Sequence, residues 1–322
     1  MMKKTLVALA AVAVTGGAFA QSVMTGSVGF KFQSETAANS TLSGWGVADG
    51  AITIKSTDDV EGLGKFDSSI GLAADSGNGS NMTAGNLSVS LTMASGVKLT
   101  GSSTYGGSYL GSGLAAAGSD YDMNMSGRIF STRSSNDAIS ISVPVMDGLK
   151  LGYTHQEADA VAGTGSASAL NTQTQAHDTV TFNYAAGSLA ADVGLRTYNN
   201  QIASTTTSAS SMSRGSVSYD LGAAKIGFGM TSVNYTYGNT NVQSGLGINI
   251  PMGKLSIGGQ LATVSTSGNA AAASNYTRSG TMVGGMYSFS KRSYATAQYY
   301  SFDAGSTVSN TSGYRMTVYN TF

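Results

Sequence analysis

The chain has 322 residues, with 17 basic and 17 acidic side chains, 43 glycines, two prolines and no cysteine. The balance of charge argues against nucleic-acid binding, which needs a clustered basic surface, and the absence of cysteine excludes disulfide bonds, so stability must come from backbone pairing and burial. Large apolar residues are few and scattered, and the composition therefore fits a polar repeat protein or a barrel better than a soluble globular core.

The first twenty residues have the pattern of an export signal. Lys3 and Lys4 precede the apolar stretch from Leu6 to Val14, and small residues occupy the cleavage positions in Ala18-Phe19-Ala20. That stretch is shorter than the run of about 20 apolar residues that a membrane-spanning helix needs. We expect cleavage after Ala20, which leaves residues 21–322 with 17 − 2 = 15 basic and 17 acidic side chains and a net charge near −2.

Beyond the signal, apolar and polar residues alternate in nearly every segment, as in strands whose successive side chains point to opposite faces. In Leu87-Ser-Val89-Ser-Leu91-Thr-Met93 the apolar residues share one face, and the serines and the threonine share the other. The same pattern predicts sixteen strands, at residues 23–32, 44–56, 66–74, 85–93, 96–103, 137–143, 148–155, 177–186, 188–197, 214–222, 224–236, 242–250, 254–264, 277–289, 292–302 and 312–322.

The connections between the predicted strands alternate between tight turns and long polar loops. The tight turns have residues typical of hairpins and include Ala94-Ser-Gly96, Val145-Met-Asp147, Ala186-Gly187, Pro251-Met-Gly253 and Ser290-Lys291. The long loops are residues 104–136, 156–176, 198–213 and 265–276. An up-and-down barrel that crosses a membrane has this rhythm, with short turns on the periplasmic side and long loops outside.

Physical reasoning favours closure of such a sheet. Lipid offers no water to the N–H and C=O groups of an edge strand, so a sheet that crosses a bilayer must close on itself. Sixteen strands leave a water-filled interior, which suits a polar face made largely of Gly, Ser, Thr and Asn. The sequence therefore predicts an all-β protein, a 16-stranded antiparallel transmembrane β-barrel of the bacterial outer membrane.

Four motifs along this chain resemble the general porins of β-proteobacteria, the Neisseria and Burkholderia type. They are Lys55-Ser-Thr-Asp-Asp59-Val-Glu-Gly62, Asn136-Asp-Ala-Ile139-Ser-Ile-Ser-Val-Pro144 followed by Gly148-Leu149, Ser288-Phe-Ser-Lys291-Arg292, and the terminal Tyr314-Arg-Met-Thr-Val-Tyr-Asn-Thr-Phe322. The resemblance implies a trimeric barrel whose third loop, Thr104 to Asn136, folds inward and narrows a pore. It also implies that the barrel assembly machinery reads Phe322.

The chain departs from that family at its lumen-facing arginines. By register, three of them fall on Ala51, Ser102 and Ser140. The anion preference that those arginines would indicate is therefore not implied here, and a weakly selective or differently tuned pore is expected.

The functional part of a pore is its narrowest ring, where opposed charges set a transverse field. We predict Asp120 and Asp122 of the third loop on one side of this constriction. A basic wall opposite them is predicted from the polar faces of the strands, at Lys55, Lys98, Lys150, Arg196 and Arg315. Arg128 and Arg133, at the return of the third loop, are also predicted at the constriction, or they could equally anchor the loop to the wall. Alternatively, some of these charges contact solvent or lipopolysaccharide at the membrane surface.

Aromatic residues near the strand ends predict interfacial girdles, with trimer packing as the alternative for any one of them. They are Tyr153, Tyr184, Tyr219, Tyr287, Tyr299, Tyr314 and Phe322.

The predicted function is passive diffusion of small hydrophilic solutes and ions through a homotrimer in outer-membrane lipid and lipopolysaccharide, without cofactor or metal. The alternatives are a substrate-specific channel and a surface adhesin built as a polar solenoid, which would need a short repeat that the sequence lacks. An enzyme would need a histidine beside a carboxylate or serine. His155 and His177 flank one long loop near such groups, but no phosphate loop or nucleophile elbow accompanies them.

Overall fold

The computed structural model describes residues 21–37, 40–74, 82–105, 135–156, 176–199, 209–236, 238–268, 275–303 and 310–322. Within these ranges, no helix is long and apolar enough to cross a membrane.

Sixteen strands follow one another along the chain, so every predicted strand is present. They are β1 (Gln21–Ala37), β2 (Ser40–Val60), β3 (Gly64–Ala74), β4 (Met82–Met93), β5 (Lys98–Tyr105), β6 (Ser135–Met146), β7 (Leu149–Gln156), β8 (His177–Ala186), β9 (Leu189–Tyr198), β10 (Ala209–Asp220), β11 (Lys225–Tyr235), β12 (Thr240–Met252), β13 (Leu255–Ser267), β14 (Tyr276–Ser288), β15 (Ser293–Asp303) and β16 (Thr311–Thr321).

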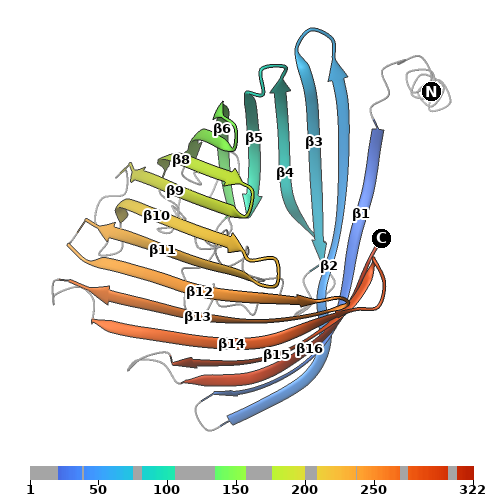
Figure 1. Ribbon diagram of the computed structural model, residues 1–322, viewed down its shortest axis with the longest axis vertical. Helices are drawn as coiled ribbons and strands as arrows, with labels where there is room; N and C mark the ends of the chain where they lie inside the picture. The colour runs from blue at the N-terminus through green and yellow to red at the C-terminus, as the bar shows by residue number, and fades with distance from the viewer. Residues whose placement is uncertain are drawn as a thin grey trace, which may run out of the picture.

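The strands form one closed antiparallel sheet, which confirms the predicted fold class. Each strand pairs with its neighbours in sequence, and β1 pairs with β16 to close the ring. Figure 1 shows the strands curving around a common interior, with β1 and β16 side by side. Closure satisfies the backbone groups that an open sheet would expose at its edges.

The seam between β1 and β16 ends in a reciprocal pair of backbone hydrogen bonds. The N–H of Gly26 donates to the carbonyl oxygen of Phe322 at 2.9 Å, and the N–H of Phe322 donates to the carbonyl oxygen of Gly26 at 3.0 Å. The Phe322 ring lies over Gly26, where a Cβ atom would come within 2.6 Å of ring carbon Cε2. Only glycine therefore gives the terminal ring room at this position.

Short connections gather at one end of the barrel. They are residues 61–63, 94–97, 147–148, 187–188, 221–224, 253–254 and 289–292. Glycines with positive φ occur at the predicted turns, as left-handed turn geometry requires, at Gly96, Gly187 and Gly253, and Gly148, the predicted start of a strand, also has a positive φ. The predicted long loops belong to the opposite end, and their central parts, including the proposed inward fold of the third loop, lie outside the described residues.

Most strand boundaries agree with those predicted from the sequence, but some differ for a physical reason. The tenth strand begins at Ala209 instead of residue 214, and the first continues past residue 32 to Ala37. These extensions consist largely of small polar residues, which carry no apolar alternation, and pairing with neighbouring strands holds them extended. Val145 and Met146, predicted in a turn, lie at the end of β6.

The two faces of the sheet differ in polarity. On β1, Val28 and Phe30 are exposed on one face, at 55% and 53% of their surface, while Lys31 and Gln33 lie on the other. Gln33 reaches Tyr300 on β15 across the intervening strand β16, with 3.0 Å between Nε2 and the hydroxyl oxygen. Side chains meet across a strand on the concave side of a curved sheet, so the polar face is the inner one and the apolar face the outer one.

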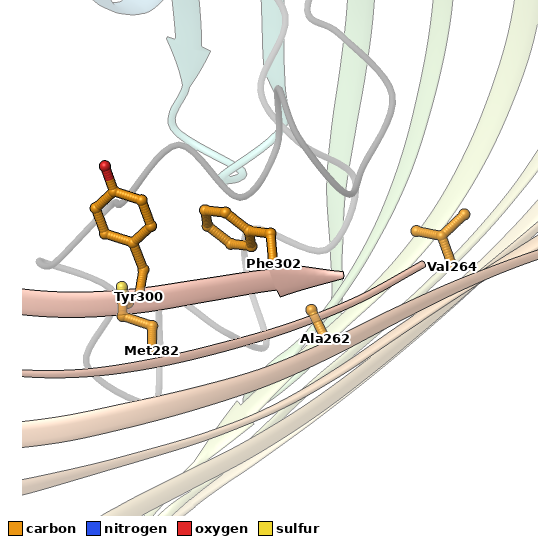
Figure 2. Packing of buried hydrophobic residues seen from close by; sticks show 5 residues of the cluster. All are labelled: Ala262, Val264, Met282, Tyr300 and Phe302. Carbon is orange, nitrogen blue, oxygen red and sulfur yellow. The ribbon is translucent and has the colours of Figure 1, made fainter. Parts of the chain in front are cut away.

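One part of the inner face is apolar. Ala262 and Val264 on β13, Met282 on β14, and Tyr300 and Phe302 on β15 form a cluster in which every residue is buried. Figure 2 shows the five side chains extending from the same face of these strands. The inner wall is therefore packed on this side of the barrel.

Candidate functional site

Two arginines lie next to each other on the inner face of β9 and β10. Arg196 donates from Nε to the Thr179 hydroxyl at 2.9 Å, and its guanidinium carbon lies 5.6 Å from the centre of the Tyr198 ring. Arg214 forms an ion pair with Asp192, with 3.2 Å between Nε and Oδ2. The Ser216 hydroxyl also donates to Asp192. Among the described residues, Asp192 is the carboxylate that pairs with this group, and it does so through Arg214.

A carboxylate occupies the inner face of β1. Glu35 accepts a hydrogen bond at Oε2 from the Tyr300 hydroxyl at 2.6 Å and another from Gln33 Nε2 at 3.1 Å. Tyr300 crosses β16 at Gly313, where a Cβ atom would come within 2.8 Å of the tyrosine oxygen. Because Gly313 has no side chain, Tyr300 of β15 can reach across β16 and hold the carboxylate of Glu35 in place.

The Glu35 carboxylate and the arginine pair lie on opposite sides of the ring. In a closed sheet of sixteen strands in chain order, β1 and β9 are half a circumference apart. Glu35 and Arg196 are each third from the long-loop end of their strands. Arg315 lies diagonally opposite Glu35 across the β1–β16 pair, so that side of the bore carries charges of both signs.

The five basic residues predicted from strand patterns all lie on the inner face, but they do not form one ring. Lys98 is the first residue of β5 and Lys150 the second of β7, so both lie at the short-turn end. Lys55 on β2 pairs across strands with Val23 and Ser69, farther from that end. Arg196 lies near the opposite end. These five residues therefore do not form a single basic wall at one depth.

Arg315 occupies the inner face of β16, between Gln33 and Gln298 on the neighbouring strands. The remaining predicted constriction residues are Asp120, Asp122, Arg128 and Arg133, which lie outside the described residues. Their role at a constriction stays a prediction.

Sequence reasoning missed Glu35, Asp192, Arg214 and Arg278 on the inner face. Glu35 was missed because residues 33–36 are all polar and carry no apolar alternation, so the strand was predicted to end at residue 32. Arg214 stood at the predicted first residue of its strand, where a face is hard to assign. Arg278, whose guanidinium carbon lies 4.6 Å from the Tyr276 ring centre, was the second residue of its predicted strand.

The two histidines point to opposite faces of the barrel. His155 lies on the outer face, where Asp178 Oδ1 is 2.8 Å from its Nδ1 and also accepts from the Tyr153 hydroxyl at 2.6 Å. His177 is buried on the inner face and packs against Tyr198, with ring centres 5.3 Å apart. The two histidines therefore cannot contribute to one catalytic site. Within the described ranges, no group of three potential metal ligands occurs.

No family model matches the sequence, and no curated protein matches it. Solved structures are nevertheless similar in fold. The chain resembles Salmonella typhi OmpF in complex with daunomycin at 10% identity and a TM-score of 0.72, over 94% of this chain and 98% of that one. It resembles OmpT, an outer membrane protein of Vibrio cholerae, in its trimer form at 10% identity and a TM-score of 0.65, over 94% and 99% of the two chains.

A variant of the Rh. blastica porin is similar as well, at 12% identity and a TM-score of 0.61, over 94% of this chain and all of that one. These likenesses span nearly the whole described barrel. At such low identity they establish the architecture alone.

Proposed function

We propose that this protein is an outer-membrane porin, a water-filled channel through which small hydrophilic solutes and ions diffuse passively. The observation that carries the proposal is the division of one closed sheet into an apolar outer face and a polar inner face. Such a molecule is stable where its outside meets acyl chains and its inside meets water. The shared architecture with the Rh. blastica porin supports the same conclusion.

Aromatic residues on the outer face support a membrane position. On β16, Tyr314 and Phe322 are exposed near opposite ends of the strand. With a strand rise of about 3.4 Å and a tilt of about 40°, they stand about 20 Å apart along the barrel axis. That separation is close to the height of the apolar band of an outer-membrane barrel, about 25 Å.

Export and orientation follow from the same proposal. Residues 1–20 serve as a cleaved signal, and residues 21–322 insert with the short turns toward the periplasm. Phe322, seated on Gly26 at the seam, serves as the signal for the assembly machinery. The protein assembles as a homotrimer, which the trimer form of the similar V. cholerae protein supports. A native mass measurement in detergent tests that assembly state.

Conductance of the purified protein in a planar lipid bilayer tests the channel function. We expect stepwise current increases as single molecules or trimers insert. A protein that stays monodisperse in buffer without detergent, and that leaves the bilayer resistance unchanged, contradicts the proposal.

The constriction remains part of this proposal, with Asp120 and Asp122 on one side and arginines of the inner wall on the other. Replacing both aspartates with asparagine should move the reversal potential in a salt gradient toward anions. An unchanged reversal potential removes the two residues from the constriction.

A further inference from the structure

Lysines recur on the inner face at the end of the barrel that carries the short turns. Lys65 is the second residue of β3, Lys98 the first of β5, Lys150 the second of β7 and Lys225 the first of β11. Their outward neighbours Phe66, Leu99, Leu151 and Ile226 are exposed and apolar. The lysines thus point into the mouth of the bore on that side.

Three of these lysines lie close together along the wall. Lys65 pairs with Thr92, Thr92 pairs with Lys98, and Lys98 pairs with Ser142 on β6. Lys150 pairs with Pro144, the next inward position on β6. Lys65 and Lys98 are therefore about 10 Å apart at a strand spacing of about 4.8 Å, and Lys98 and Lys150, also displaced by two residues along the strands, are about 12 Å apart. Side chains of this length can share one anion across that distance.

The charge of these lysines is only partly balanced. Lys65 faces Asp59 across the strand pair and has Asp67 two residues along the same face, and Lys225 faces Asp220 across its strand pair. The cross-strand partners of Lys98 are Thr92 and Ser142, and those of Lys150 are Pro144 and Asn183, all of them uncharged. Both lysines are exposed, and neither has a carboxylate within ion-pair distance among the described residues. The positive field therefore centres on Lys98 and Lys150.

Depth separates this group from the charges discussed above. Arg196 and Glu35 lie near the long-loop end, whereas these lysines lie at the short-turn end. A mouth lined by charge of one sign and walled by low-dielectric material concentrates counter-ions. At 0.1 M salt the field of each lysine extends about 10 Å, so the fields of neighbours overlap.

We propose that Lys65, Lys98 and Lys150 form an anion filter at the short-turn mouth, which takes small polyvalent anions of the phosphate class. The proposal rests on the channel function above and adds its ion preference, its ligand class and the end of the bore at which they are set. Because the filter lies at one mouth only, the current carried by anions depends on the polarity of the voltage. Thr92 and Ser142, between the lysines, supply hydroxyl groups to the phosphate oxygens.

Oriented channels in a planar bilayer test the filter. The chain has no cysteine, so a Ser188→Cys substitution in an exposed short turn gives a unique thiol. A membrane-impermeant thiol reagent added to one chamber then identifies the chamber that the short turns face. In a potassium chloride gradient we expect a preference for chloride, and we expect inorganic pyrophosphate to reduce the current at lower concentration from the short-turn side than from the loop side.

The K98Q/K150Q double variant removes the unbalanced charges from the mouth. We expect the permeability ratio of chloride to potassium to fall roughly twofold at 0.1 M salt, and the difference to shrink at 1 M salt, where the Debye length is about 3 Å. The pyrophosphate block should lose its dependence on side. Lys291→Gln is the control for position, because it removes one lysine charge from a turn tip at the same end, and it should leave both measurements unchanged.

The outcomes separate this inference from the channel function. Open channels with equal pyrophosphate sensitivity from both sides, or a double variant that behaves like the K291Q control, overturn the filter while the channel stands. A protein that forms no channels at all removes the proposed function itself. Normal stepwise insertion of the double variant shows that the barrel still folds.

Discussion

The inner wall of the barrel has two halves with different chemistry. On β2 to β7 the basic residues of the inner face are lysines, and Lys55, Lys65, Lys98 and Lys150 are all exposed. On β9 to β16 they are mainly arginines, surrounded by buried side chains such as Tyr300 at 2% and Thr231 at 1% exposure. A lysine ammonium is strongly hydrated, whereas a guanidinium tolerates partial burial and planar contacts. Lysine on a strand therefore indicates the half of the wall that faces water, and arginine indicates the packed half.

Hydrogen bonding differs between the two halves for the same reason. On the packed half, Asn241 donates from Nδ2 to the Thr266 hydroxyl at 2.8 Å, and Gln243 donates from Nε2 to Asn241 Oδ1 at 2.9 Å. Buried amides need such partners because burial removes them from bulk water. On the lysine half, most inner-face serines and threonines are only half-buried, so water can reach them.

The largest loss of stability is expected when the largest buried side chain of the packed half is removed. Tyr300→Ala should lower the free energy of unfolding by about 3–5 kcal/mol, because it leaves a cavity and takes the phenol from Glu35. Urea unfolding in lipid vesicles, followed by the fluorescence of Trp45, measures the loss. Tyr300→Phe, which keeps the ring, should cost about 1 kcal/mol. Equal losses for the two variants contradict packing as the main contribution.

A second test uses the ion pair of the packed half. Arg214→Gln should destabilise the barrel by roughly 1–3 kcal/mol, since the Asp192 side chain, only 8% exposed, loses its guanidinium partner. The same unfolding assay measures the change. A double variant R214Q/D192N should recover part of the stability, and a failure to recover any would show that the ion pair is not the cause.

The cost of replacing an inner-face glycine with alanine should also differ between the two halves. Gly313 on β16 lies under Tyr300, and Gly46 on β2 has no atom within 4 Å of the place of a Cβ. Gly313→Ala should cost about 1–3 kcal/mol, because a methyl group would overpack the site. Gly46→Ala should change the free energy of unfolding by less than about 0.5 kcal/mol. Both are measured by urea unfolding, and similar costs would remove the distinction between the halves.

The smallest effect on stability is expected on the lysine half. Lys55→Gln should leave the free energy of unfolding within about 0.5 kcal/mol of the parent, because the side chain is exposed. Single-channel recordings in a salt gradient should nevertheless show a weaker preference for anions. A large loss of stability without a change in selectivity would place Lys55 among structural residues.

Local patterns were enough to predict the fold. Alternation predicted all sixteen strands, because each strand has one apolar and one polar face whatever its neighbours are. The same alternation assigned Lys55, Lys98 and Lys150 to the polar face. It missed the start of β10, where Ala209-Ser-Ser carries no contrast between faces.

The site was harder to predict, because strand pairing around the barrel sets the depth of each charged residue along the barrel axis and the side chains that it contacts. Tyr300 and Glu35 are 265 positions apart in the sequence and meet only because the barrel closes. Nothing in the residues around Lys98 and Arg196 shows that one lies at the short-turn end of its strand and the other near the loops. These relations depend on register across several strands, which a single sequence does not reveal.

The bonded contact between Gly26 and Phe322 has a consequence for the order of events in folding. The two strands most distant in sequence must find each other, and loop-closure entropy makes that step slow compared with the hairpins that precede it. Until then, β1 and β16 each present a free edge to other chains. The interval between hairpin formation and ring closure is thus the period in which a nascent molecule most needs a chaperone to keep it from aggregating.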